Sequence, residues 1–193
     1  MRFILGSQSP RRKEILSYLK IPFEQIPSHF DERSILFKED PLSYVSSIAR
    51  EKAHSLAEKH SDAIILTADT IVYRKNKIYQ KPINREDAFN TLKELSGKWH
   101  SVYTGIAVWH KKKTFLDVEE TKVLFNALKA EQIHRYHNTI HFLDKAGAYA
   151  IQETGCLICK KIEGCYYNVM GLPLNACRKV LAQIGLDIWK YIG

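Results

Sequence analysis

The chain places arginines, lysines and carboxylates beside short apolar segments, and side chains of these types can bind anions and metal ions. The segment Ser7–Arg12 follows a short apolar run and precedes apolar residues at helical spacing. Ser9 suits the cap of a helix, and Pro10 suits its first position, where a missing N–H costs nothing. Free amides at a helix start favour an anion, and the Arg11 and Arg12 guanidinium groups can grip phosphate. Because the glycines and lysine of a P-loop are absent, an ordinary helix start with solvated arginines stays an alternative.

Two acidic positions could complete a phosphate site with a divalent ion. Asp69 follows the continuous apolar run Ala63–Ala68, which predicts a strand that is buried on both faces and ends at Asp69–Thr70. Ligand sites in open α/β sheets form beyond the carboxyl ends of strands, although Asp is also a common turn residue. Glu32 lies in a polar loop after a short strand expected over residues 23–26. Carboxylates near cationic phosphate ligands suit Mg²⁺, which usually bridges substrate phosphates.

Two lysines occupy positions that spacing leaves ambiguous. Lys52 lies on or beside the apolar stripe of a long helix that Asp40 is expected to cap. Such a lysine can extend to the edge of the buried face, which spacing alone favours, or project its ammonium into a site. Lys81 follows a hairpin predicted over residues 71–79. These cations and carboxylates together fit phosphoryl hydrolysis, which needs an oriented water, charge neutralisation at phosphorus and a stabilised leaving group.

Composition describes an ordinary globular chain of 193 residues, with 45% hydrophobic and 26% charged residues and a formal net charge of +8. That charge fits an enzyme for a polyanionic small molecule or a nucleic-acid binder. The basic residues are spread along the chain, and their one run, Lys111–Lys113, is expected at a hairpin tip. No apolar run could span a bilayer, and Phe3–Leu5 is too short for a signal-peptide core. A cytoplasmic protein without a membrane partner is expected.

Cysteine and histidine clusters in the last third of the sequence do not predict a metal centre. The pair Cys156 and Cys159 has no second ligand pair at zinc spacing, so reduced thiols are expected. A helix predicted over residues 130–136 carries His134 and is followed by His137 and His141. No carboxylate or cysteine completes a ligand set with these histidines, and all of them are expected at the surface.

Strands that alternate with helices predict an α/β fold with a mixed twisted sheet and helices on both faces. Asn84 is expected to cap a helix that ends before Gly97, and a last helix is expected after Pro173. A further strand is expected to follow Tyr149 and to end at Gln152 and Glu153. No repeat or flexible linker divides the chain, so residues 1–193 are expected to form a single domain.

Motifs in a particular order extend along nearly the whole chain, and together they are far more specific than any one of them. They are Ser7–Arg12, Arg50–Ala53, Ala68–Thr70, Lys81–Pro82, Gly97–Thr104, Lys145–Gln152 and Asn168–Pro173. In these motifs the chain closely resembles the Maf family of nucleoside triphosphate pyrophosphatases. The resemblance implies a fold like that of the Maf and ITPase proteins, with two lobes around a central cleft.

The resemblance also implies a reaction and roles for residues. The family hydrolyses nucleoside triphosphates to the monophosphate and pyrophosphate with Mg²⁺, Mn²⁺ or a similar ion. By resemblance, Asp69 would accept a proton from water, and Glu32 and Asp69 would hold the metal. The triphosphate would be bound by residues of several motifs, namely Ser7, Ser9, Arg12, Lys52 and Lys81.

Base preference divides the family that the chain resembles. Arg11, Thr70 and Gln152 match the branch that acts on dTTP, UTP and modified uridine triphosphates, and an amide such as that of Gln152 can both donate to and accept from a pyrimidine edge. The alternatives are the 7-methyl-GTP branch and a non-enzymatic nucleic-acid-binding regulator of division. No specific nucleic-acid partner is expected for the enzyme, and the resemblance implies a possible homodimer.

Overall fold

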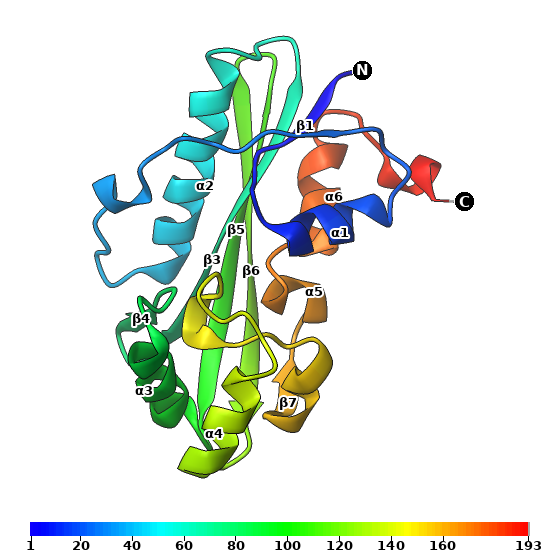
Figure 1. Ribbon diagram of the computed structural model, residues 1–193. Coiled ribbons are helices and arrows are strands. Elements are labelled where there is room, and N and C mark those ends of the chain that lie inside the picture. The colour runs from blue at the N-terminus through cyan, green and yellow to red at the C-terminus, as the bar shows by residue number, and fades with distance from the viewer. Residues whose placement is uncertain (193) are drawn as a thin grey trace. The chain divides into compact units, whose positions relative to one another are not determined.

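The computed structural model describes residues 1–192, which form an α/β fold (Figure 1). Within these residues, seven strands form a sheet in the order β2-β1-β3-β5-β6-β7, and β4 pairs with β3 outside this order. The strands are β1 (Phe3–Leu5), β2 (Glu24–Gln25), β3 (Ile64–Arg74), β4 (Lys77–Tyr79), β5 (Trp99–His110), β6 (Lys113–Phe125) and β7 (Cys159–Glu163). The sheet is mixed, because β1 runs parallel to β2 and β3 whereas β4 and β7 are antiparallel to their partners. The predicted α/β class with a mixed sheet is confirmed.

Helices and short 3-10 turns alternate with these strands. The α-helices are α1 (Pro10–Ser17), α2 (Pro41–Ala57), α3 (Arg85–Leu95), α4 (Ala130–His137), α5 (Tyr166–Val169) and α6 (Leu174–Ala182). The 3-10 turns are η1 (Glu32–Ser34), η2 (Ala146–Ala148), η3 (Glu153–Leu157) and η4 (Ile188–Tyr191). Across residues 1–192, no helix combines the length and the apolar character that crossing a bilayer requires.

The chain divides into two compact units. The first comprises Met1–Asp69, Thr104–Glu119 and the chain from Gly171 on, and the second comprises Thr70–Tyr103 and Glu120–Met170. The strands β3, β5 and β6 contribute residues to both units. A single domain over residues 1–193 stays a prediction, and its last residue lies outside the described part of the chain.

In the first unit, α2 covers one face of the strands, and α1 and α6 lie on the other face (Figure 1). Aliphatic side chains and one tryptophan form the buried cluster between α2 and the strands, namely Ile4, Ala49, Ala53, Leu56, Ala57, Ala63, Ile65, Ala107 and Trp109. A Cβ on Gly105 of β5 would lie 2.5 Å from the carbonyl oxygen of Val45, so this strand position admits only glycine. The α2 backbone therefore packs directly against β5, which fixes the height of α2 above the sheet.

In the second unit, aromatic and hydroxyl groups hold the segment after α4. The Tyr136 hydroxyl accepts from the Ala150 N–H at 2.9 Å and donates to the Ala150 carbonyl at 3.0 Å. The Tyr149 ring packs edge-to-face on Phe125 and on His100. These hydroxyl bonds and ring contacts hold the irregular segment around Tyr149 and Ala150 in place, although it forms no strand.

Three local predictions are wrong. The strand does not end at Asp69, because Ile71–Tyr73 favour extended backbone and β3 continues to Arg74, paired with β4. Gln152 does not end a strand, since left-handed backbone at Ala148 and Glu153 (φ 60° and 51°) bends the chain into η2 and η3. His137 is 2% exposed rather than at the surface, because it ends α4 on its buried side.

The other local predictions for the termini of elements hold. Ser9 caps α1 with Pro10 in the first turn, Asp40 caps α2 and Asn84 caps α3. The short strand expected over residues 23–26 is present as the two residues of β2. The cysteines are free thiols, of which Cys156 is exposed.

Candidate active site

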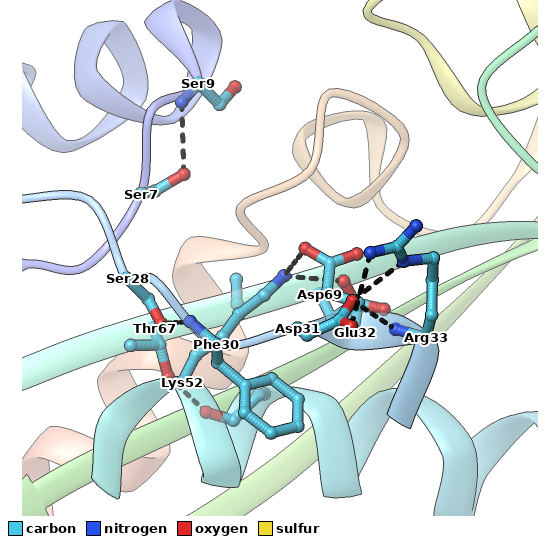
Figure 2. A network of polar contacts seen from close by, with 12 residues as sticks. Ser7, Ser9, Ser28, Phe30, Asp31, Glu32, Arg33, Lys52, Thr67 and Asp69 are labelled. Atoms are coloured by element: carbon cyan, nitrogen blue, oxygen red, sulfur yellow. Dashed lines mark hydrogen bonds and ion pairs between the residues drawn. The ribbon is translucent and has the colours of Figure 1, made fainter. Parts of the chain in front are cut away.

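An ammonium group held between two carboxylates forms the centre of the candidate site in the first unit (Figure 2). The Nζ of Lys52 lies 2.9 Å from Oδ1 of Asp69 and 2.7 Å from Oε1 of Glu32. Lys52 and Asp69 are buried, whereas the Glu32 side chain is 49% exposed. The cluster therefore places a buried carboxylate beside a solvent-accessible one.

Strand and helix periodicity together place Lys52 opposite Asp69. Thr67 and Asp69 are two residues apart in β3, so their side chains leave the strand on the same face. Ala49 and Lys52 are three residues apart in α2 and are neighbours on its surface. The Thr67 hydroxyl donates to the Ala49 carbonyl at 2.6 Å, and Lys52 donates to Asp69 one step further along both elements. The lysine therefore projects into the site rather than toward the edge of the buried face.

Serine contacts hold the loop that brings Glu32 to Lys52. The hydroxyls of Ser28 and Ser55 lie 2.9 Å apart, which joins the loop to α2. The Phe30 N–H donates to the Ser28 hydroxyl at 3.2 Å, and this turn leads into η1, whose first residue is Glu32 (Figure 2). Since Ser55 and Lys52 belong to the same helix, α2 positions both the cation and the loop that carries its partner.

The Ser7–Arg12 segment forms the predicted turn between β1 and α1. The Ser7 Oγ accepts from the Ser9 N–H at 3.2 Å and from Nη1 of Arg12 at 3.3 Å. A hydroxyl oxygen has two lone pairs, and both are engaged here. The Ser7 proton is therefore available to an acceptor outside the turn, such as a phosphate oxygen.

Backbone carbonyls anchor Arg12 in this turn. Its Nε donates to the Gly171 carbonyl and its Nη1 to the Ala68 carbonyl, both at 2.8 Å. Burial lowers the pKa of Arg12 below its usual value, and the negative charges of Asp69 and Glu32 offset only part of that shift. Because Ala68 precedes Asp69, Arg12 joins the turn to the strand that carries the buried carboxylate.

Predicted site residues are distributed over both units. The first unit contains Ser7, Ser9, Arg11, Arg12, Glu32, Lys52 and Asp69, and it brings the last four into one electrostatic cluster. The second unit contains Thr70 in β3, the exposed Lys81 after β4, and the partly exposed Gln152 before η3.

The two carboxylates fit a hard divalent ion. Mg²⁺ is usually held by one or two carboxylates together with substrate phosphates and water. Glu32 and Asp69 each place a carboxylate oxygen within 2.9 Å of the same Lys52 nitrogen, so the two carboxylates lie close together. Residues 1–192 hold no group of three or more His, Cys, Asp or Glu side chains placed for a metal. An ion shared with substrate phosphate fits these residues better than a protein-only cage.

Several residues around the site gave no signal in the sequence. Gln25 donates from Nε2 to the Ser7 carbonyl, and Thr67 and Ser55 position α2 and its loop contact. Burial raises the pKa of Tyr44, and the charges of Asp69 and Glu32 add to that effect. Among these residues, only Thr67 could have been identified from the sequence, because it lies two positions before Asp69 in the same strand. The other contacts join segments that are distant in the sequence.

Chemically, the arrangement combines cations with a carboxylate able to accept a proton. Lys52 and Arg12 supply positive charge, and the Ser7 hydroxyl supplies a hydrogen-bond donor. A polyanion with an electrophilic phosphorus matches this inventory, because its charge would be neutralised while Asp69 orients water.

Comparison with known proteins gives a consistent result over the whole chain. The family model described as Maf-like protein matches residues 2–184. A dTTP/UTP pyrophosphatase of Chlamydia caviae is 43% identical over 192 residues, covering 99% of this chain and 98% of that protein. A dTTP/UTP pyrophosphatase of Aquifex aeolicus is 44% identical over 186 residues, covering 96% of this chain and 97% of its own.

A solved structure supports the fold alone. The Ham1 protein of Staphylococcus aureus superposes with a TM-score of 0.50 at 12% identity, over 96% of this chain and 98% of that one. The family match and the near-complete coverage of its relatives settle the classification. This chain belongs to the Maf family.

Proposed function

We propose that this chain is a nucleotide pyrophosphatase that hydrolyses dTTP and UTP to the monophosphate and pyrophosphate. The observation that carries the proposal is the identity of about 43% with relatives named dTTP/UTP pyrophosphatase, over nearly the full length of both chains. The buried Asp69 beside Lys52 and Arg12 is the chemistry that such a reaction needs.

In the proposed mechanism, Asp69 takes a proton from the attacking water. As the water oxygen bonds to phosphorus, the phosphoanhydride bond breaks and pyrophosphate leaves with its negative charge. Lys52 contacts both carboxylates, and in this mechanism its ammonium stabilises negative charge on the phosphates. The Ser7 hydroxyl and Arg12 bind phosphate oxygens from the turn before α1.

Glu32 and Asp69 would hold a divalent ion, Mg²⁺ or Mn²⁺, which supplies charge neutralisation on the phosphates when it is bound. Ser9 and Lys81 are proposed as further phosphate ligands. Arg11, Thr70 and Gln152 are proposed to select the pyrimidine, since the Gln152 amide can donate and accept at its edge. These roles follow from the family resemblance of the motifs that carry the residues.

The test is pyrophosphate release from dTTP, UTP, CTP, GTP and 7-methyl-GTP, each with and without Mg²⁺. Metal-dependent release from dTTP and UTP is the expected result. Preference for 7-methyl-GTP would overturn the proposed roles of Arg11, Thr70 and Gln152 but keep the reaction. No release from any nucleotide would overturn the proposed function. The homodimer and the cytoplasmic location stay predictions, and sedimentation velocity would test the first.

A further inference from the structure

Gln25 is placed where the backbone pairing between β1 and β2 stops. It pairs with Leu5 in the register of the two strands, and the Ile26 N–H donates to the Leu5 carbonyl at 3.1 Å. Beyond this bond, the Gln25 side chain provides the hydrogen bonds to the chain after β1. Its Nε2 donates to the Ser7 carbonyl at 2.8 Å and to the Ser9 carbonyl at 3.4 Å. A single amide thus fixes two carbonyls of the turn that leads into α1.

The bond to the Ser7 carbonyl fixes the orientation of a whole peptide plane. The C=O of Ser7 and the N–H of Gln8 belong to the same trans peptide, so they point in opposite directions. With the carbonyl held toward β2, the Gln8 N–H points away from it. Gln8 is exposed, and its N–H makes no hydrogen bond to residues 1–192.

The neighbours of this N–H suit an anion. The Ser7 hydroxyl, with both lone pairs engaged, is a donor in the same turn. Arg11 and Arg12 follow at the positive end of α1. Successive donors of this kind in one turn form an anion-binding concavity.

We propose that Gln25 is a positioning residue for the substrate triphosphate, which holds the Ser7–Gln8 peptide so that the Gln8 N–H donates to a phosphate oxygen. This inference rests on the proposed function. Gln25 acts through the peptide and does not itself touch the substrate.

The amide of glutamine is the chemistry this position requires. It offers N–H donors to the two carbonyls without adding charge to the turn. Gln25→Met keeps most of the volume and removes the donors. Gln25→Glu keeps the shape, but the loss of the N–H donors leaves carboxylate oxygens facing the carbonyl oxygens of Ser7 and Ser9. The second variant therefore perturbs the turn more strongly than the first.

The experiment measures kcat and KM for dTTP with Mg²⁺, and the Kd of a non-hydrolysable dTTP analogue, for the parent chain and both variants. For Gln25→Met, KM and Kd rise about 3- to 10-fold while kcat stays within about 2-fold, because a phosphate contact acts in the ground state as well as in the transition state. For Gln25→Glu the rise is larger. Glu24→Gln is the matched control. Glu24 precedes Gln25 in β2, but its side chain contacts Arg2 at the surface.

A purely structural role for Gln25 would lower the thermal unfolding midpoint and leave KM and Kd unchanged in the folded variants, and that result overturns the inference. If the parent chain released no pyrophosphate, the proposed function would fail instead. Analogue binding by Gln25→Met and the parent chain at equal Kd would then overturn the role of Gln25 as well. A rise in Kd for the variant alone would support it without any turnover.

Discussion

The two units of this molecule bury ionisable side chains in opposite ways. In the first unit, Lys52 and Asp69 are both less than a tenth exposed and meet as an ion pair. In the second unit, His100 and His137 are 3% and 2% exposed, and burial lowers the pKa of both, to about 4 for His100. Burying a charge costs far more than burying a neutral imidazole that needs only a hydrogen bond.

The difference is consistent with the proposed role of the buried ion pair in the reaction. A buried ion pair rarely stabilises a fold more than apolar side chains of similar volume would, so stability alone does not account for Lys52 and Asp69. Their contact with the half-exposed Glu32 fits the proposed role, because it connects the buried pair to the solvent-accessible surface. The neutral His100 bonds to the Tyr149 hydroxyl and packs on aromatic rings, which is a structural role.

The largest expected effect is that of Asp69→Asn on turnover. Removing a proton acceptor typically lowers kcat by about 10²- to 10⁴-fold, and the amide keeps the shape of the side chain. Pyrophosphate release from dTTP is the measurement, and circular dichroism checks the fold. Asp62→Asn is the control, because Asp62 lies at the surface near Arg2. Full activity in Asp69→Asn would remove this residue from the mechanism.

Lys52→Met tests the buried pair itself. The substitution leaves the Asp69 carboxylate buried without its partner, which costs about 3 kcal/mol in the free energy of unfolding. The double variant Lys52→Met with Asp69→Asn is expected to recover much of that loss, since no buried charge remains. Urea unfolding of the parent, both single variants and the double variant measures the coupling. Additive losses would show that the two side chains do not interact in the folded chain.

The buried His100 of the second unit is expected to make the stability of the chain depend on pH in the acid range. Because the pKa of His100 is depressed in the folded chain, the unfolded chain binds more protons between about pH 6.5 and pH 4. The stability is therefore complete above the ordinary pKa and falls as pH drops through this window, by an amount of the order of a few kcal/mol. Thermal unfolding midpoints across pH 4 to 8 measure the fall. His100→Gln, which can still bond to Tyr149, should flatten the profile, and an unchanged profile would assign the acid sensitivity elsewhere.

Thr67→Val is expected to have the smallest effect. It removes the bond to the Ala49 carbonyl, keeps the shape of the side chain, and lowers the unfolding free energy by about 1 kcal/mol. If this bond also fixes Lys52 opposite Asp69, the variant shows a few-fold loss of kcat at a temperature where it is fully folded. Unchanged kcat would mean that the close packing at Gly105 suffices to position α2.

Capping and turn chemistry were predictable from the sequence because they are local. Ser9, Asp40 and Asn84 each bond to backbone within four residues, so their types alone indicate a helix start. The motif order likewise gave the family, which the comparisons confirm.

Contacts between distant segments were not predictable in the same way. Periodicity placed Lys52 on a helix face but left open what lay beneath that face, and the answer depends on the register of α2 against β3. Asp69 was expected at a strand end, whereas it lies within a strand that continues into a hairpin. Gln25 has no local signature, because its partners are eighteen and sixteen positions away.

The Ser7 hydroxyl in the turn before α1 accepts two hydrogen bonds, which leaves it only its proton to offer to a further partner. A serine hydroxyl in solution is ambivalent, but here the Ser9 amide and the Arg12 guanidinium take both lone pairs. The Ser7 hydroxyl can then act only as a donor, so its partner must have a free lone pair. An ionised phosphate oxygen is a strong acceptor for this donor, an alcohol oxygen is a weaker one, and an ammonium group cannot accept at all. If the proposed function is correct, this fixed donor favours the ionised phosphate groups of a nucleotide independently of its base.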